Sequence, residues 1–328
     1  METSQNQSCQ KIELNRLKFF PIMMFAIIMG LSGLAIVYEK AHELFHLPSI
    51  IGKGLLILDA AIFVVVGLFY LFKLLKYPEE VNKEFNHPIR INFFATISIS
   101  FLLISIAFHP INKDIAYYCF ISGTLLQTYF TLRTISFWIN QNLKLDHSNP
   151  AWFIPIVGNV LVPVAGASFV DVNFLMYYFS IGMFFWIILT AILINRIIFH
   201  HQLAGKFVPT LFIFIAPPAV AFIAYLKMNG MHYDMFASAL YNLALFFTFL
   251  LLFMYKNFLN LKFFISWWAF TFPLTAVTIA SMLAFKLTHI VIYKYLAMFF
   301  MIMATIVILL VALRTIQHMF KGEICIEE

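Results

Sequence analysis

One short stretch of this sequence has the spacing of a zinc hydrolase. His42, Glu43 and His46 form His-Glu-x-x-His, in which two histidines one helical turn apart would bind zinc and the glutamate would act as general base. Pro48 follows two residues later, we expect a short loop here, and we find no third ligand elsewhere in the chain. We therefore expect a chance match, with no metal, no cofactor and no enzymatic activity. An intramembrane zinc protease is kept as the weakest alternative.

Two charged side chains interrupt otherwise apolar stretches. Arg133 costs about 2.5–3.5 kcal/mol inside a membrane, and Asp59 is the obvious partner by charge. Their expected depths differ, because Asp59 lies about 14 Å below one membrane surface at 1.5 Å per residue and Arg133 lies near the other. We expect no direct pair, and expect Arg133 to extend toward the interface or to meet Glu79 or Glu80.

The composition determines the class of protein that must position these groups. The chain has 328 residues, of which 62% are hydrophobic and 11% charged, whereas soluble domains carry about 25% charged residues. This indicates a protein that crosses the lipid bilayer many times. The three cysteines, at 9, 119 and 325, form no CxxC and support neither a disulfide framework nor a zinc site. The first apolar run ends in Tyr38-Glu39-Lys40, not in a cleavage site, so we expect an uncleaved first span.

Ten apolar spans are each long enough to cross a hydrocarbon core about 30 Å thick. We place them at 19–38, 50–76, 91–108, 115–141, 151–170, 172–199, 207–226, 233–259, 263–285 and 290–319. Fifteen of the 21 lysines and arginines fall on the side that holds both termini. Since cytoplasmic loops are enriched in these residues, we expect both termini in the cytoplasm and the protein in the cell membrane.

The odd-numbered and even-numbered spans differ in composition. Every proline within a span lies in an odd span, and the odd spans contain no Asp, Glu, Lys or Arg. Each odd–even pair is a helical hairpin entered from the same face, so the five hairpins are related by an axis along the membrane normal. Irregular backbone at membrane depth is tolerated only inside protein or beside a wet cavity. We therefore expect an all-α integral membrane fold, with odd helices around a central pore and even helices outside.

The candidate pore lining contains small, hydroxylated and amide side chains. With the positive ends of the broken helices, it weakly favours anions, although residues of these types are also common at contacts between membrane helices. The expected kinks are at Pro155, Pro217, Pro273 and Gly30. The pore-lining candidates are Ala26, Ser98, Asn159, Trp268, Thr275, Ala276 and Ile279.

The stretch "SWWAFTFPLT" at 266–275 contains a candidate gate. Trp268, Phe272, Ala276 and Ile279 share one helical face. If that face points to the axis, the Phe272 ring would close the pore by occlusion or dewetting. The competing interpretation is ordinary packing, because the chain has 40 phenylalanines.

Several motifs resemble the tellurite-resistance/dicarboxylate transporter family, which includes bacterial TehA-like proteins and plant guard-cell slow anion channels. They are "FAIIMGLSGL" (25–34), "HPIRINFF" (87–94), "NPAWFIPIVGN" (149–159), "APPAVAFIAYL" (216–226) and above all "WWAFTFPLT" (267–275). The resemblance covers nearly the whole membrane region. It implies five hairpins around one pore per subunit, a homotrimer, small anions as the transported species and occlusion by the phenylalanine that corresponds to Phe272.

The chain departs from the family at some positions. Spans one and three lack a proline that related bacterial proteins have, and Ala26 stands where the resemblance places a glycine near the gate. Pore width and anion order are therefore open.

These observations predict a gated channel for small anions, residues 19–319, between a cytoplasmic segment 1–18 and a cytoplasmic tail 320–328. The alternative is a secondary carrier for dicarboxylates or tellurite-type oxyanions, which should place a charged or strongly polar group at mid-membrane. The gating stimulus and physiological role do not follow from the sequence, and no nucleic-acid partner is needed to explain the net positive charge.

Overall fold

The computed structural model describes residues 16–325, which form helices and no strand. The expected segments 1–18 and 320–328 lie partly outside this range. The principal elements, with 3-10 segments labelled η, are η1 Ile22–Phe25, α2 Ala26–Phe45, α3 Ser49–Lys76, η2 Arg90–Phe94, α5 Ala95–Phe108, α6 Lys113–Asn140, η4 Pro150–Phe153, α7 Ile154–Gly166, α8 Val172–Phe199, η5 Gly205–Ile215, α9 Ala216–Met228, α10 Met235–Phe253, η6 Ile265–Phe270, α12 Thr271–Thr288 and α13 Val291–Phe320. Short helices α4 Pro78–Phe85, η3 Leu145–His147 and α11 Lys256–Leu259 lie between them.

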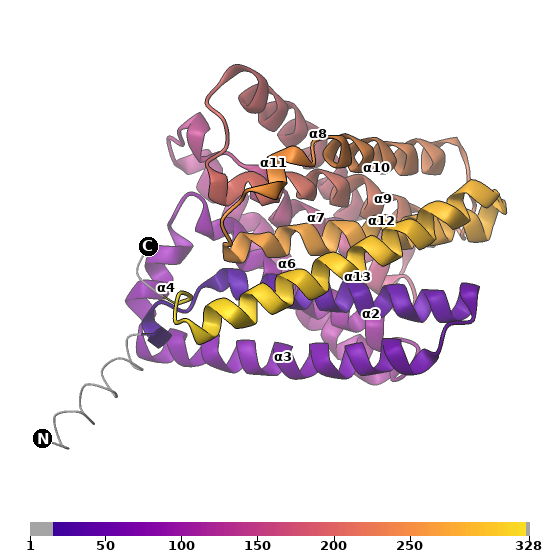
Figure 1. Ribbon diagram of the computed structural model, residues 1–328, viewed down its shortest axis with the longest axis horizontal. Coiled ribbons are helices and arrows are strands. Elements are labelled where there is room, and N and C mark those ends of the chain that lie inside the picture. The colour runs from indigo at the N-terminus through magenta and orange to yellow at the C-terminus, as the bar shows by residue number, and fades with distance from the viewer. Residues whose placement is uncertain (1–15, 326–328) are drawn as a thin grey trace, which may run out of the picture.

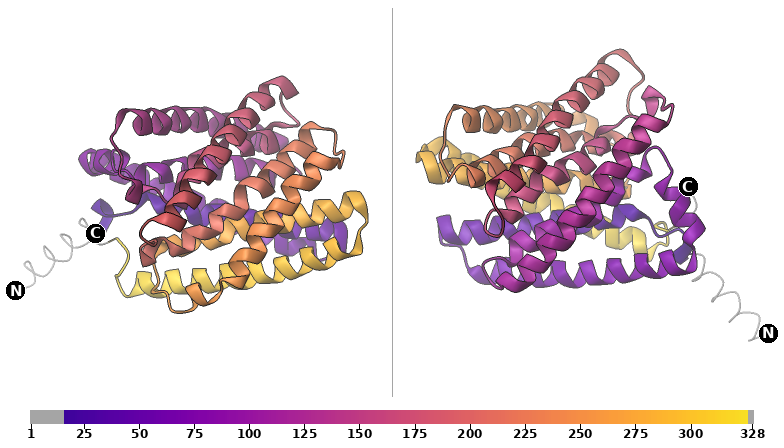
Figure 2. Two further views of the ribbon diagram at one scale, coloured as in Figure 1. Left: turned by 90° about the horizontal axis from the view of Figure 1, so that it is seen from above. Right: turned by 180° about the vertical axis from the view of Figure 1, so that it is seen from behind.

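The helices form five hairpins around a closed inner ring. Each odd span contacts the helix that follows it, as α2 does α3 and α12 does α13. The inner helices also contact one another in the cyclic order α2, α5, α7, α9, α12 and back to α2. The long helices run roughly horizontally in Figure 1, and Figure 2 shows the same bundle from above and from behind.

Burial separates the inner helices from the outer ones, as the sequence predicts. Within residues 16–325, eight helices are long and apolar enough to cross a membrane. In the inner ones 78–83% of the best apolar stretch is buried, and in the outer ones 22–39%. The segment Pro150–Gly166 is shorter and α6 is less apolar, so for these two the membrane crossing stays a prediction. Asp171 caps α8 by accepting a hydrogen bond from the Asn173 backbone N–H, which confirms the expected division there.

Each inner span starts as a 3-10 helix and continues as an α-helix. The change falls at Ala26, Ala95, Ile154, Ala216 and Thr271. Pro155 and Pro217 are in the first turn of their α-helices, and Pro273 is the third residue of α12. Proline is tolerated in a first turn because its missing N–H would have no partner within the α-helix. Prolines therefore lie near the start of three of the five inner α-helices, whereas α2 and α5 have none in their first turn.

Side chains satisfy the carbonyl groups at these junctions. In η4–α7, the Pro155 carbonyl accepts hydrogen bonds from Gln127 Nε2 at 2.7 Å and Asn159 Nδ2 at 2.9 Å. Gln127 Oε1 accepts from the Ser98 hydroxyl at 2.6 Å. A Cβ atom on Gly158 would collide with the Gln127 amide, so this glycine makes room for it. The buried Gln127 of α6 thereby connects three helices at a point where no water is available.

Glycines let α2 approach α12 closely. An added Cβ on Gly30 would collide with Thr271, and one on Gly33 would collide with Thr275. The helix α2 runs from Ala26 to Phe45 without interruption through Gly30, and the change of helix type occurs four residues earlier, at Ala26. Gly30 therefore permits a close contact between helices, and the helix type does not change at this residue, where we expected a kink.

Three inner helices extend beyond the spans expected from hydropathy, among them α12, which continues to Thr288 and includes Lys286. The helix α2 continues to Phe45 and includes Glu39, Lys40 and Glu43, while α9 continues to Met228 and includes Lys227. The prediction that the odd spans carry no charged residue is therefore wrong for their ends. Hydropathy places a boundary at the first charged residue, whereas a helix can continue into the interface with its charges solvated.

We expect Gly33→Ala to destabilise the bundle by about 1–3 kcal/mol, because the new methyl group overfills the α2–α12 contact. The thermal midpoint of the purified protein in detergent measures this. Adding Thr275→Gly to Gly33→Ala should restore much of the loss, whereas Gly67→Ala on α3, where the added atom meets nothing within 4 Å, should not lower the midpoint. Equal effects of the two single glycine substitutions would contradict the close contact.

We expect Gln127→Met to lower stability by about 1–3 kcal/mol, because a side chain of similar size can no longer donate to the Pro155 carbonyl. Asn242→Met is the control, since Asn242 is exposed and its amide bonds only to Ser238 of its own helix. A thermal midpoint that falls no further for Gln127→Met than for Asn242→Met would show that the network does not stabilise the junction.

Candidate functional site: an axial pore

A small axial cavity lies inside the inner ring. All five inner spans line it, which places it on the bundle axis. Its volume is about 40 Å³, and its wall includes Ala26, Ile99, Val157, Ala216 and Phe272. The other lining residues are Met23, Met29, Phe93, Thr96, Ile154, Ile213, Ile265, Ser266, Trp268, Ala269 and Pro273. Among these described residues none is charged, so the middle of the ring offers an apolar passage.

A larger cavity of about 790 Å³ opens at the end of the bundle that holds residues 16 and 325, which we call the terminal end. It shares Met23 and Ile265 with the axial cavity and therefore adjoins it. Six lysines and arginines line this terminal cavity, with three glutamates. The basic residues are Lys18, Lys73, Lys83, Arg90, Lys206 and Lys262. This mouth carries an excess of positive charge, which would raise the local concentration of anions.

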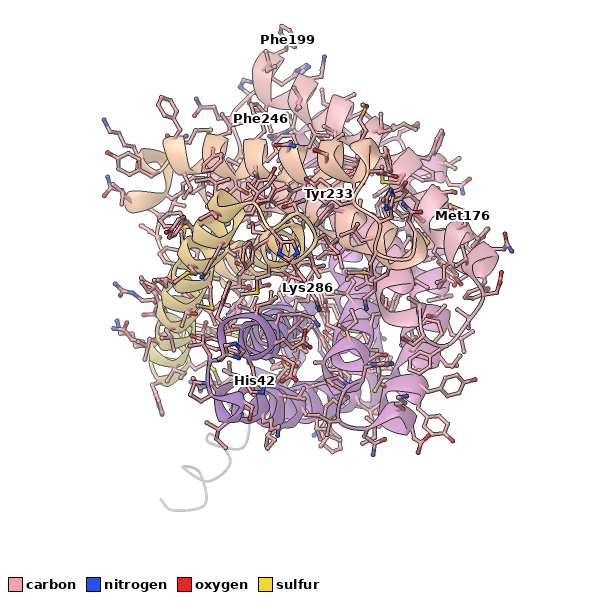
Figure 3. All side chains as sticks on the ribbon, turned by 90° about the vertical axis from the view of Figure 1, so that its right-hand side faces the viewer. His42, Met176, Phe199, Tyr233, Phe246 and Lys286 are labelled. Carbon is pink, nitrogen blue, oxygen red and sulfur yellow. The ribbon has the colours of Figure 1, made fainter. Side chains whose placement is uncertain are left out.

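A third cavity, of about 210 Å³, lies at the opposite, distal end. The distal ends of α2, α5, α7 and α9 form it together with the start of α3. Figure 3 looks onto this end of the bundle, where His42 of α2 and Lys286 of α12 are labelled. Lysines line this distal cavity as well, at positions 40, 53 and 227.

A closed stretch separates the axial cavity from the distal cavity. On α2, α5 and α7, the last residue lining one and the first lining the other are six or seven residues apart, about 10 Å along a helix. One residue of each inner helix lies between the two cavities on the same helical face. We call Leu103, Leu161, Ile223 and Ile279 the distal apolar layer, together with Gly33 of α2, which contacts Thr275 of α12; all five are buried.

Phe272 lies where the axial cavity meets the closed stretch. Its side chain is 6% exposed and lines the cavity, and it forms none of the aromatic pairs identified among the described residues. Phe270, two positions earlier, instead packs edge-on against Phe212 and Phe258, with ring centroids 4.8 and 5.7 Å away. The two phenylalanines therefore differ in surroundings, one beside a void and one inside an aromatic cluster.

The hydroxyls around Phe272 bond to the backbone. Thr271 donates to the Trp268 carbonyl at 2.7 Å and Thr275 to the Phe272 carbonyl at 2.8 Å. The Trp268 indole N–H donates to Thr315 of α13 at 2.9 Å. These bonds satisfy the turn before Pro273 and hold η6 against its outer helix.

The sequence-predicted pore residues fall into two groups. Ala26, Trp268, Phe272 and Pro273 line the axial cavity together. The polar candidates instead bond between or within helices and lie outside the three cavities. Ser98 and Asn159 belong to the Gln127 network, and Thr275 packs against Gly33. Ala276 and Ile279 are both buried and line neither the axial nor the distal cavity; Ile279 belongs to the distal apolar layer.

The two charged groups at membrane depth do not meet each other, as expected. Arg133 donates to Asn86 at 2.8 Å, with its guanidinium 5.0 Å from the Phe85 ring. The expected contact between Arg133 and Glu80 is wrong, because Glu80 pairs with Lys83 at 2.8 Å. Asp59 accepts a hydrogen bond from Ser32 of α2, so it connects an inner helix to an outer one and does not enter the pore.

Three residues of the zinc-hydrolase pattern have other roles. The helix α2 ends at Phe45 and His46 adopts a left-handed conformation, so His42 and His46 are not on successive turns of one helix. His42 Nδ1 lies 2.7 Å from the Leu47 carbonyl, and Glu43 pairs with Lys40 at 3.0 Å. Within residues 16–325 no cluster of three metal-ligating side chains is present. We expected a short outer loop at residues 42–46, and this is wrong because α2 continues to Phe45.

Sequence reasoning missed Gln127 and Lys227. Gln127 lies in an outer span. The signal in the sequence is a polar amide within an apolar span, together with Gly158 in the next hairpin, which leaves room for that amide. Hydropathy places Lys227 just outside the seventh span, because the expected boundary is one residue before it.

Comparison with known proteins agrees with this geometry. Residues 19–316 match the model of the SLAC1 family, described as voltage-dependent anion channel. The S-type anion channel SLAH3 of Arabidopsis thaliana is 28% identical over 309 residues, covering 92% of this chain and 48% of the relative. The tellurite resistance protein TehA homolog of Haemophilus influenzae is 28% identical over 314 residues, covering 94% of each. The malic acid transport protein of Schizosaccharomyces pombe is 27% identical over 234 residues, covering 65% of this chain and 53% of the relative.

The chain spans about half the length of the plant and yeast relatives and almost the whole of the bacterial one. The family match covers nearly all of the five hairpins, the axial and distal cavities and most of the terminal cavity, whose residues Lys18, His318, Glu323, Ile324 and Cys325 lie outside it. The chain is a multi-pass membrane protein and belongs to the SLAC1 family of voltage-dependent anion channels.

Proposed function

We propose that this protein is a gated channel that passes small anions along the axis of its inner ring. The observation that carries the proposal is the sequence of cavities on that axis: a basic mouth, an apolar middle and a second mouth lined by lysines. Positive mouths attract anions, and an apolar constriction closes a pore by dewetting. Described residues of the axial cavity offer no charged side chain that would hold an ion tightly.

Phe272 is the proposed gate. Its ring lines the axial cavity, and Pro273 follows it in the first turn of α12. The distal apolar layer continues the closure beyond the ring. Rotation of the ring away from the axis would extend the axial cavity as far as that layer. Phe272 would therefore control the half of the closed stretch that adjoins the axial cavity.

A carrier for dicarboxylates is the second candidate, favoured by the relative whose name states malic acid transport. Carriers place polar or charged recognition groups near mid-membrane. The two hydroxyls on the axial cavity already donate to carbonyls, Thr96 to Phe93 and Ser266 to Lys206. With no further polar anchor among the described lining residues, the channel is the better supported of the two.

Assembly and location complete the proposal. The outer helices expose large apolar side chains along their length, which suits contact with lipid and with other subunits. We propose a homotrimer in the cell membrane with one pore in each subunit and both termini in the cytoplasm. The terminal cavity would then be the cytoplasmic mouth and the distal cavity the outer one.

Phe272→Ala is expected to raise anion conductance severalfold, because alanine removes most of the ring that blocks the axial cavity. Phe272→Leu should raise it less, since leucine still obstructs. The ring has a void on one side, so the loss of stability should be smaller than the about 3–5 kcal/mol typical of a buried phenylalanine. Planar-bilayer recording in chloride and nitrate gradients measures conductance, and the thermal midpoint measures stability.

Phe270→Ala is the matched control for this gate. It removes the same volume from an aromatic cluster away from the axis, so it should destabilise the protein and leave the conductance of the folded fraction unchanged. If Phe272→Ala behaves like Phe270→Ala, the ring is packing and the closure lies in the distal apolar layer. A current that requires a proton gradient would favour the carrier.

Single-cysteine labelling tests the proposed orientation. In a background with Cys9, Cys119 and Cys325 replaced by serine, Asn142→Cys should react only with reagent on the cytoplasmic side, because Asn142 is exposed at the terminal end. His232→Cys, exposed at the distal end, should react only from outside. The opposite pattern of labelling would reverse the proposed orientation.

A further inference from the structure

The distal cavity has a particular arrangement of charged groups at the far end of the closed stretch. Lys40, Lys53 and Lys227 line it together with Glu39 and Glu43. These five groups leave one net positive charge. The distal ends of four inner helices and the start of α3 bound the cavity, so an ion that leaves or enters the pore through this cavity passes these groups.

Two of these charges neutralise each other. Lys40 and Glu43 form an ion pair at 3.0 Å, and Glu43 is also 3.9 Å from Lys286. The Glu39 carboxylate lies toward Gly52 at the start of α3. Lys53 and Lys227 therefore remain together with one carboxylate, that of Glu39, which leaves the one net positive charge of the distal cavity.

Lys227 is held in a defined position. Its ammonium donates a hydrogen bond to the Val164 carbonyl at 2.6 Å, near the end of α7. Within residues 16–325 it forms no ion pair with a carboxylate. An ammonium has three N–H donors, so two remain for a ligand. A carbonyl carries no negative charge that would cancel that of the ammonium, whereas a carboxylate does.

The surroundings of Lys227 strengthen its field. Apolar side chains of Ile36, Ile106 and Ala165 form part of the same wall, and a low-dielectric wall concentrates the field of a charge. His109 lies on this wall as well. Burial, together with the positive charges of Lys227 and Lys113, lowers the pKa of the His109 imidazole, which agrees with a positive potential here.

We propose that the distal cavity is a capture site for one small anion, with the Lys227 ammonium as its principal ligand. The proposal rests on the channel function above and adds a binding position to it. Lys227 lies four residues beyond Ile223 of the distal apolar layer, about 6 Å along α9. An anion bound to Lys227 would therefore wait immediately outside the closed stretch.

The size of the distal cavity limits the ligand. Pockets for drug-sized molecules are about 300–1,000 Å³, whereas this cavity is about 210 Å³. It suits chloride or nitrate with part of its hydration shell. Glu39 and Glu43 on the same wall would repel an ion carrying two negative charges, so a monovalent anion is the expected ligand.

Anion-dependent thermal stability tests the site without requiring an open pore. Sodium chloride or sodium nitrate at about ten times the dissociation constant should raise the midpoint of the wild-type protein by about 2–4 °C. Lys227→Gln should lose most of this increment, and Lys227→Arg should keep it, because arginine retains the charge. Lys294→Gln is the matched control: it removes one lysine near the distal end of α13 that does not line the cavity. An equal increment in wild type and Lys227→Gln, or none in wild type, would overturn the site.

Current measurements separate this inference from the proposed function. In the Phe272→Ala background, Lys227→Gln should raise the half-saturating chloride concentration on the distal side severalfold, and Lys294→Gln should not. A Phe272→Ala current with the same half-saturation in both variants counts against the capture site and leaves the channel intact. Absence of current in every variant, with a Lys227-dependent thermal increment, counts against the channel and supports the site.

Discussion

The structure depends on hydrogen bonding of backbone groups that no water can reach. Five inner helices change from 3-10 to α geometry within the bundle, and each change disturbs the regular ladder of bonds. An unsatisfied carbonyl in hydrocarbon costs several kcal/mol. Side chains meet this cost, as at the Pro155 carbonyl, which accepts from Gln127 of α6, the outer helix of the preceding hairpin, and from Asn159 of α7 itself. The ring arrangement brings the Gln127 donor to this carbonyl, because α6 packs against α7 as well as against α5.

The same constraint explains why the pore is apolar. Hydroxyl and amide groups on the inner helices are needed for backbone carbonyls and helix contacts, as Ser98, Thr271 and Thr275 show. Once they are bonded there, the surface that faces the axis consists mainly of methyl groups and aromatic rings. In the proposed channel such a passage would close by dewetting, and charged side chains line the cavities at its two ends.

Close packing of the ring accounts for the tightness of the closure. Gly33 brings α2 against Thr275 of α12, and Gly158 admits the Gln127 amide between α6 and α7. Without these glycines the inner helices would stand further apart, and the distal apolar layer would not fill the axis. The ends of the inner helices are less restricted, since they reach the interface. Lys227 can therefore place a charge one turn beyond the closed layer without the cost of burying it at mid-membrane.

The sequence by itself determined the helical membrane class, the hairpin alternation and the inner position of the proline-bearing spans, because hydropathy and proline placement are local properties of the chain. It also singled out Phe272, Pro273, Ala26 and Trp268, which the structure brings to one cavity. Only the tertiary structure decided which polar residues face the axis. Three polar residues lie on inner helices but point toward other helices and away from the axis: Ser98, Asn159 and Thr275. The sequence does not show this, because the rotation of a helix about its own axis depends on its neighbours. The same holds for Gln127 and Lys227: the sequence shows an amide and a lysine, and the fold determines that one supports a broken helix while the other lines the mouth of the pore.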